Sequence, residues 1–266
     1  MSGGSLPVRR VEKVWGREVL PAPFVDPVGA RIGEIWFEPP ADLPQLLVKY
    51  IFTNEKLSVQ VHPSDRDAPG KGKEECWLIL DAQPGATLGI GFRQETPPDA
   101  IRAAAIDGSI EELMAWHTVR PGDFYYIPAG TVHAIGAGIS LIEVQQNSDV
   151  TYRLYDYGRP RALHLDQAVA VANGAPYPVR LRGFLPARAS RSLVDGPLFR
   201  LDQVEGVPDP GLTARYRGGL LIIPREGPVH IAGQEVAPGG CGFARDLAEV
   251  EFSSSGVSLL AQPCSA

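Results

Sequence analysis

Residues 122–133 read Gly-Asp-Phe-Tyr-Tyr-Ile-Pro-Ala-Gly-Thr-Val-His. The aromatic and branched residues at 123–127 predict a β-strand, and the Pro-Ala-Gly that follows predicts a tight turn leading to His133. Short runs of this kind recur along the chain, separated by its 29 glycines and 25 prolines. This texture is typical of an antiparallel β protein.

Residues 57–62, Leu-Ser-Val-Gln-Val-His, predict a second strand with polar groups on one face. Because side chains alternate along a strand, Ser58, Gln60 and His62 should share that face, while the apolar residues between them pack into a core. The run Gly-Lys-Glu-Glu-Cys-Trp at 72–77 begins another strand. Two imidazoles, a carboxylate and an amide suit a divalent ion, so we predict a metal site formed by Gln60, His62, Glu75 and His133.

The rest of the chain divides into short strands and two helical segments. Further strands are expected at 30–37, 45–53, 75–80, 87–92, 140–145 and 151–155. Helix-forming residues at helical spacing predict an insertion at about 98–116, divided by Gly108 into two short helices. Residues 159–178 indicate a linker with one short helix. Later strands are expected at 199–204, 214–217, 219–224, 229–231, 249–252 and 257–261.

A faint internal repeat suggests two related halves. Arg-Pro-Gly-Asp-Phe-Tyr-Tyr-Ile at 120–127 aligns with Ala-Pro-Gly-Gly-Cys-Gly-Phe-Ala at 237–244. In this alignment Val250 falls where the first half has His133, so the second half should lack a metal. We therefore expect a metal-binding β-barrel with the helical insertion at residues 1–170, and a second, metal-free barrel at residues 171–266.

Composition limits the possible partners. The formal net charge is −6 and the sequence contains no long Lys/Arg cluster, which argues against nucleic acid and anionic membranes. A small anionic molecule stays possible, because a pocket can be locally basic.

No apolar run approaches a membrane span, and the first residues lack the apolar core of a secretory signal, which predicts a cytoplasmic protein. The three cysteines are widely separated, which predicts inert thiols rather than disulfides.

Residues 122–133 fit the second sequence motif of the cupin superfamily, although its terminal Asn is replaced by Ala137. The usual His-x-His of the first cupin motif is Gln60-Val61-His62 here. Together with Gly-Lys-x-Glu-x-Trp at 72–77 and Gln-Gln-Asn-Ser-Asp-Val-Thr-Tyr-Arg at 145–153, the chain closely resembles type I mannose-6-phosphate isomerases of the short bacterial branch, over roughly residues 10–165. This resemblance implies a mainly β fold of two cupin-like jelly-roll barrels, with a short helical insertion in the first.

The resemblance also implies a cofactor and a reaction. In that family the zinc ligands match Gln60, His62, Glu75 and His133; iron, manganese or cobalt would suit the same ligand types. The implied reaction interconverts mannose 6-phosphate and fructose 6-phosphate, small hexose phosphates, through an enediolate. A cation near the two reacting oxygens would stabilise the charge of that intermediate. The oligomeric state is left as monomer or homodimer, and the general base is not identified.

Four further residues match positions of the family site. Arg153 is expected to bind the anionic intermediate or the phosphate, and Ser58 to touch the phosphate. Lys73 should share a strand face with Glu75, and Lys49 lies in an otherwise apolar strand, so both are expected to be catalytic and Lys73 also to bind substrate. Two simpler interpretations remain: Lys49 extends to solvent from a strand edge, and Arg153 merely pairs with Asp149 or Asp156. The remaining histidines, at 117, 164 and 230, are read as ordinary packed or exposed side chains.

Two other functions are compatible with a metal-binding cupin. An iron-dependent oxygenase generally uses three histidines and a glutamate or a facial triad, so Gln60 and the basic residues fit a phosphosugar better. A non-catalytic sugar-phosphate-binding cupin would keep the metal without turnover, and the presence of Arg153 and the lysines argues against it.

Overall fold

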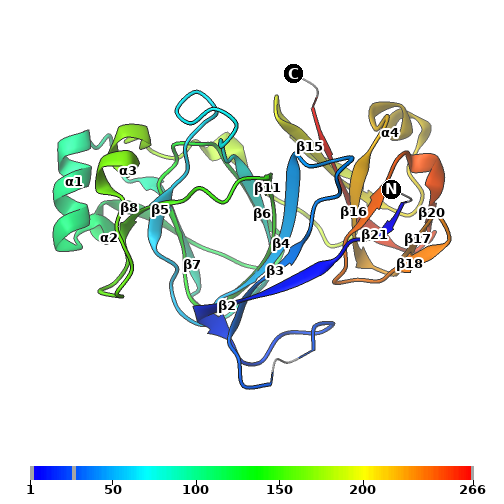
Figure 1. Ribbon diagram of the computed structural model, residues 1–266, viewed down its shortest axis with the longest axis horizontal. Coiled ribbons are helices and arrows are strands. Elements are labelled where there is room, and N and C mark those ends of the chain that lie inside the picture. Colours follow the sequence, from blue (N-terminus) through cyan, green and yellow to red (C-terminus); the bar gives the residue numbers. More distant parts are fainter. Residues whose placement is uncertain (1–2, 26–27, 265–266) are drawn as a thin grey trace.

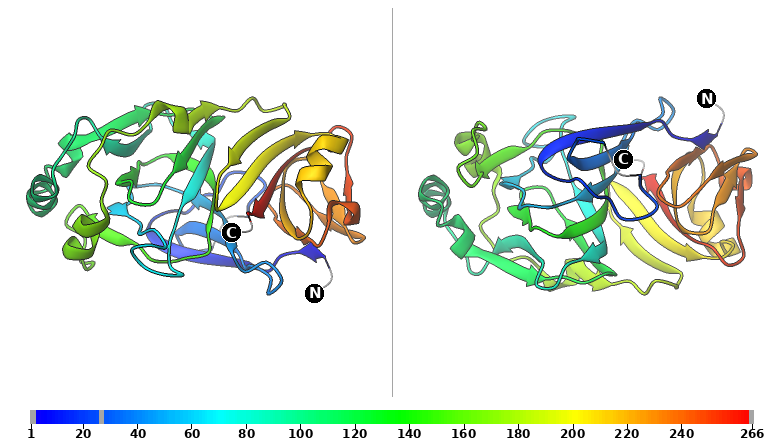
Figure 2. Two further views of the ribbon diagram at one scale, coloured as in Figure 1. Left: turned by 90° about the horizontal axis from the view of Figure 1, so that it is seen from above. Right: turned by 90° about the horizontal axis from the view of Figure 1, so that it is seen from below.

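The computed structural model describes residues 3–25 and 28–264. Antiparallel strands form four sheets, which make two bodies lying side by side along the long axis (Figure 1). Helices α1 (Pro98–Asp107), α2 (Ile110–Leu113) and α3 (Leu165–Val171) pack on the first body, at the end of the molecule far from the second body (Figures 1 and 2). Within the described ranges, no helix is long and apolar enough to span a membrane.

The first body consists of two sheets that enclose a core. The seven-stranded sheet has the order β13 (Arg182–Phe184), β9 (Asp123–Ile127), β6 (Glu75–Ala82), β11 (Ile139–Gln146), β4 (Leu46–Phe52), β3 (Ile32–Phe37) and β2 (Val8–Arg17). The five-stranded sheet has the order β12 (Tyr152–Tyr155), β5 (Val59–Val61), β10 (His133–Ile135), β7 (Thr87–Phe92) and β8 (Met114–Thr118). Apolar side chains from both sheets, among them Trp77, Ile90 and Ile135, form one cluster between them.

The second body repeats this plan with fewer strands. Its six-stranded sheet has the order β1 (Gly4–Ser5), β19 (Gly242–Ala244), β16 (Leu220–Glu226), β21 (Val257–Pro263), β15 (Phe199–Glu205) and β14 (Arg191–Asp195). Its three-stranded sheet has the order β18 (Gln234–Val236), β17 (Val229–Ile231) and β20 (Val250–Phe252). Leu220, Ile231 and Leu260 belong to the cluster that these two sheets enclose. The expectation of a mainly β, cupin-like fold is confirmed.

The second body covers the outer face of the seven-stranded sheet. In β4, Val48, Tyr50 and Phe52 point outward into a cluster shared with the six-stranded sheet. Ile51, between them, points into the first body. A sheet buried on both faces needs apolar residues at nearly every position, which explains why β4 reads as a continuous apolar run. The same alternation brings Lys49 into the interior of the first body, where a charged group needs partners.

The predicted helical insertion is confirmed as α1 (Pro98–Asp107) and α2 (Ile110–Leu113). Gly108 separates them with φ +86°, a conformation that glycine adopts at little cost, and its N–H donates to Ala104 O. The end of the insertion differs from the prediction, because residues 114–116 already belong to β8. The linker helix is α3 (Leu165–Val171), which packs with α1 and α2 on the five-stranded sheet.

The strand predicted at 214–217 is wrong, because its first half belongs to the helix α4 (Pro210–Arg215) and its second half is not a strand. Asp209 caps the helix by accepting a hydrogen bond from the Leu212 N–H, and Pro210 occupies the first turn, where its missing N–H costs nothing. Arg215 at the last turn forms ion pairs with Asp195 and Asp202. The pair Asp209-Pro210 is a helix start signal that the prediction of a strand at 214–217 did not take into account.

Strand pairing crosses the expected division of the chain at residue 170. The N-terminal strand β1 pairs with β19 of the second body, and β13 pairs with β9 of the first. The segments 1–170 and 171–266 therefore exchange one short strand each. Their status as two separate domains stays a prediction.

Candidate metal centre and substrate cavity

Two buried histidines direct their Nε2 atoms toward one point inside the first body. His62 follows β5, and its Nδ1 lies 2.8 Å from Val150 O. His133 begins β10, and its Nδ1 lies 2.9 Å from Thr131 O. A carbonyl oxygen only accepts, so each Nδ1 carries the proton and each Nε2 keeps its lone pair. Burial lowers the pKa of both imidazoles, which keeps them neutral and able to bind a metal.

Glu75, at the start of β6, places its carboxylate beside both Nε2 atoms. Oε2 is 3.6 Å from His62 Nε2, and Oε1 is 3.5 Å from His133 Nε2. The three residues are buried and offer ligand atoms within 4.8 Å of one another. Neither carboxylate oxygen accepts a well-directed hydrogen bond. Burial raises the pKa of Glu75, but Lys73 and then His133 more than offset this, so the group is ionised. This set fits a divalent ion.

Gln60 lies directly opposite His133 in the β5–β10 pair. Its Nε2 donates to His133 Nε2 at 3.2 Å, and its Oε1 accepts from Ser58 Oγ at 3.1 Å. A 180° rotation of the Gln60 amide would exchange its nitrogen and oxygen. The oxygen, which is the atom that can bind a metal, would then lie beside His133 Nε2. The structure thus brings the amide next to the three other groups, and its role as fourth ligand stays a prediction.

Lys73 lies among these groups. Its Nζ is 2.5 Å from Glu75 Oε2 and 3.1 Å from His62 Nε2. Burial lowers the pKa of Lys73, but the carboxylates of Glu143 and then Glu75 outweigh it, so the net pKa is raised. Lys73 is therefore a buried ammonium at neutral pH, adjacent to the residues that could hold the ion.

Glu143 on β11 is a residue that the sequence analysis missed. Its Oε1 is 3.1 Å from Lys49 Nζ and 3.8 Å from Lys73 Nζ, and its Oε2 accepts from Trp77 Nε1 at 3.0 Å. A buried carboxylate thus links the two lysines. The available signal was a single acid inside the apolar run Ser-Leu-Ile-Glu-Val, since an unpaired charge would be costly there.

Lys49 does not extend to solvent. Its side chain is 6% exposed, and Nζ pairs with Glu143 and lies 4.4 Å from the centre of the Trp36 ring. The interpretation of Lys49 as an edge residue with a solvated ammonium is therefore wrong, because β4 is not an edge strand and Lys49 points into the first body toward Glu143.

Arg153 on β12 donates from Nη1 to Ala162 O at 2.9 Å. Asp156 is instead held by Arg159 and Arg161. Burial, and then the neighbouring charge of Arg161, lower the pKa of Arg153. A half-buried guanidinium close to a second one favours an anionic ligand over the simple pairing with Asp156.

A cavity of about 340 Å³ connects these side chains. Five of the residues expected to act on substrate or metal line it: Lys49, Ser58, Gln60, Lys73 and Arg153. Trp36, Glu143 and Arg161 line it as well. A pocket that combines aromatic walls with cationic groups suits a small, polar, anionic ligand.

Tyr155 lies two residues after Arg153 on β12, a spacing that in a regular strand would place both side chains on one face. The register between β12 and β5 shifts between Arg153 and Tyr155. Tyr155 packs with the helical cluster instead, with its ring against Tyr157. The shift in register therefore turns the Tyr155 side chain out of the cavity, whereas Arg153 lines it.

No protein-family model matches the chain. A mannose-6-phosphate isomerase from Streptococcus mutans is 35% identical over 210 residues, which cover 72% of this chain and 65% of that relative. The chain is similar to mannose-6-phosphate isomerases. It matches less than two thirds of the length of this relative. The resemblance inferred from the motifs is confirmed.

Solved structures of mannose-6-phosphate isomerases share the fold. The enzyme from Bacillus subtilis has a TM-score of 0.71 at 23% identity, covering 98% of this chain and 100% of that one. A zinc-bound mannose 6-phosphate isomerase has a TM-score of 0.73 at 15% identity, covering 100% of both chains. The structural similarity therefore extends over both bodies, although the sequence motifs that carry the resemblance lie in the first.

Proposed function

We propose that this chain is a metal-dependent aldose–ketose isomerase that interconverts mannose 6-phosphate and fructose 6-phosphate. The observation that carries the proposal is the buried group of His62, Glu75 and His133 beside a cavity lined by three lysines and two arginines. An isomerase of this type must hold a sugar phosphate and stabilise an enediolate. Cationic side chains next to a metal site meet both needs.

Gln60, His62, Glu75 and His133 are proposed as the metal ligands. Zinc is our first assignment, since two imidazoles and a carboxylate suit this borderline ion and a structural neighbour binds zinc. When bound, the ion supplies Lewis acidity to the substrate oxygens. The His62 lone pair that now faces Lys73 can serve only one cation, so Lys73 must release it when an ion binds.

The remaining residues are proposed to bind and orient the sugar phosphate. Arg153, beside Arg161, attracts the anionic intermediate or the phosphate, and Ser58 contributes a hydroxyl at the cavity wall. Lys73 and Lys49 are proposed as catalytic groups, held by Glu143 so that both ammonium groups face the cavity. Burial excludes water around these charges, which strengthens their interaction with substrate.

We also propose that the protein acts in the cytoplasm as a monomer or homodimer, and that residues 1–170 and 171–266 are two domains.

An iron-dependent oxygenase remains the second candidate for the reaction, and a sugar-phosphate-binding protein without turnover the third. The buried Lys49–Glu143–Lys73 network favours the isomerase, since charge buried at this cost is typical of active sites.

One assay separates these functions. Protein reconstituted separately with zinc, cobalt, manganese or iron is incubated with fructose 6-phosphate, and mannose 6-phosphate is measured. Turnover with at least one metal supports the proposal. No turnover with any of the four would reject it, and metal-dependent oxygen uptake would favour the oxygenase.

Arg153→Ala is expected to retain the metal and lose activity. The side chain lies outside the group that could hold the ion, and its loss removes a charge that the anionic intermediate needs. Removing one such donor typically costs on the order of 10²- to 10³-fold in turnover. Metal content is measured by elemental analysis beside steady-state kinetics. Arg245→Ala, which removes an exposed arginine of the second body, is the control and should behave as the parent. Parental turnover in Arg153→Ala would show that its assigned role is wrong.

A further inference from the structure

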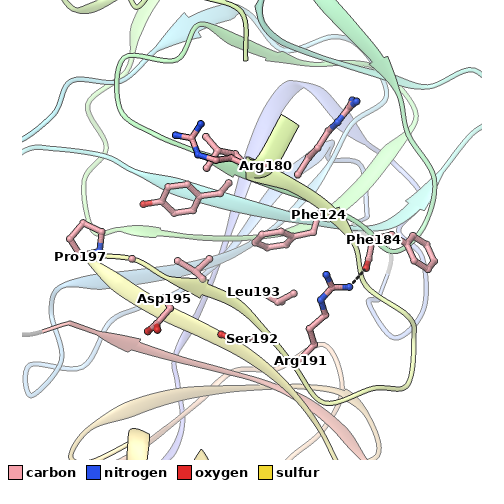
Figure 3. Close-up of a pocket in the computed structure, with 14 residues that line it drawn as sticks. Phe124, Arg180, Phe184, Arg191, Ser192, Leu193, Asp195 and Pro197 are labelled. Atoms are coloured by element: carbon pink, nitrogen blue, oxygen red, sulfur yellow. Dashed lines mark hydrogen bonds between the residues drawn. The ribbon is translucent and has the colours of Figure 1, made fainter. Parts of the chain in front are cut away.

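A second cavity, of about 290 Å³, lies between the two bodies. Strands β9 and β13 of the seven-stranded sheet wall it on one side, and β14 of the six-stranded sheet walls it on the other (Figure 3). It shares no lining residue with the substrate cavity described above. Its ligand would therefore be separate from the hexose phosphate.

One wall of this cavity is apolar. Phe124 and Val194 are buried in the cluster between the two bodies, and the partly buried Tyr126 and Leu193 pack against that cluster. In Figure 3 the ring of Phe124 lies between Arg180 on one side and Arg191 on the other. A flat apolar group placed here would meet an aromatic ring and aliphatic carbon atoms.

The rim carries two exposed arginines, Arg180 and Arg191, whereas Arg182 pairs with Tyr125 and therefore points to the opposite face of β13. Arg191 donates to Phe184 O at 2.9 Å. Arg182 contacts His117 Nδ1 at 3.1 Å, and burial, then Arg182 itself, lower the pKa of His117, so this partner is a neutral imidazole. Arg180 lines the cavity, and its guanidinium forms no hydrogen bond with the part of the chain that the structure describes. Across the described residues, none of the three forms an ion pair with a carboxylate.

The only acid in the cavity wall, Asp195, is already engaged. Its Oδ1 pairs with Arg215 Nη2 at 3.1 Å. Among the described residues, two guanidinium groups therefore face a cavity without a free carboxylate, in a chain whose formal net charge is −6. Guanidinium groups match phosphate and carboxylate geometry, and a local positive field in an acidic protein attracts anions.

We propose that this cavity binds a small organic anion of the aryl phosphate class. Its phosphate pairs with the arginines of the rim, and its ring packs against Phe124 and Leu193. The cavity volume limits the ligand to about one ring system with its anionic group. The proposal does not depend on the isomerase activity, since the two cavities use different side chains.

Binding is tested by fluorescence titration with 1-naphthalenesulfonate, an anionic aromatic probe with one ring system, followed by displacement with phenyl phosphate. We expect the double variant Arg180→Ala/Arg191→Ala to bind the probe at least tenfold more weakly. Phenyl phosphate should displace it from the parent at lower concentration than either phenol or inorganic phosphate alone. Arg10→Ala/Arg93→Ala, which removes two exposed arginines elsewhere, is matched in charge and should bind as the parent does.

A variant whose new side chain fills the cavity tests the binding proposal independently. Gly183 pairs with Phe124 across β13 and β9, so a side chain at 183 would stand beside the Phe124 ring. A Cβ at this position meets no atom within 4 Å, which allows Gly183→Trp to fold while blocking the cavity. Loss of probe binding in this variant, with the melting temperature unchanged, supports the proposal. Parental affinity in both cavity variants, or equal displacement by phenol and phenyl phosphate, would overturn it.

Discussion

Replacing His133 with alanine is expected to remove the metal and the isomerase turnover together. The His133 Nε2 lies within 4.8 Å of the ligand atoms of His62 and Glu75, and its Nδ1 is fixed by Thr131 O. Losing a partner that merely orients a ligand costs about 10- to 100-fold in metal affinity, so losing the ligand itself should cost more. Without the ion, the charge of the enediolate loses its strongest source of stabilisation, and turnover should fall by at least about 10³-fold.

The measurement is metal content after dialysis, beside turnover with fructose 6-phosphate. The variant also leaves the Gln60 amide without its acceptor, so the fold is checked by circular dichroism and melting temperature. His117→Ala removes an imidazole outside the metal centre and should keep parental metal content and activity. A His133→Ala protein that binds the ion with parental affinity would exclude His133 as a ligand.

Much of the first body could be predicted because its strands carry strong local signals. Thr87–Phe92 and Asp123–Ile127 have the predicted bounds, and Gly108 separates the two helices as expected. The local sequence pattern did not predict strands that form only because they pair with a strand distant in the sequence. β13 is a three-residue exposed strand, and nothing local in Arg-Gly-Phe indicates that it pairs with β9. Likewise, capping by Asp209 favoured a helix over the strand predicted at 214–217.

The candidate site was predicted in part for the same reason. Alternation along one strand places Gln60 near His133 only if β5 and β10 are neighbours, and the motif resemblance supplied that information. Glu143 belongs to no such motif, and its role depends on β11 lying beside both β4 and β6. Charge pairing across three strands is a property of the sheet order, which the sequence analysis did not derive.

Glu143→Gln is expected to destabilise the protein and to impair turnover without removing the metal. The change keeps the size of the side chain and its contact with Trp77, but it takes away the carboxylate shared by Lys49 and Lys73. Lys73 keeps Glu75, whereas Lys49 keeps only the Trp36 ring. Leaving a buried charge without its partner costs about 3 to 5 kcal/mol in free energy of unfolding. Displaced ammonium groups should also lower turnover, with metal content unchanged because Glu143 is not among the ligands.

Chemical denaturation of the parent, Glu143→Gln, Lys49→Met and the double variant measures the coupling directly. If Lys49 depends on Glu143, the double variant should lose less free energy of unfolding than the two single changes added together. Glu38→Gln is the matched control, since Glu38 pairs with Arg9 at 2.9 Å on the surface and should cost less than about 1 kcal/mol. A Glu143→Gln protein as stable as the control, or strict additivity in the cycle, would show that the lysines do not require this carboxylate. In that case the orientation of Lys49 would have to come from Trp36.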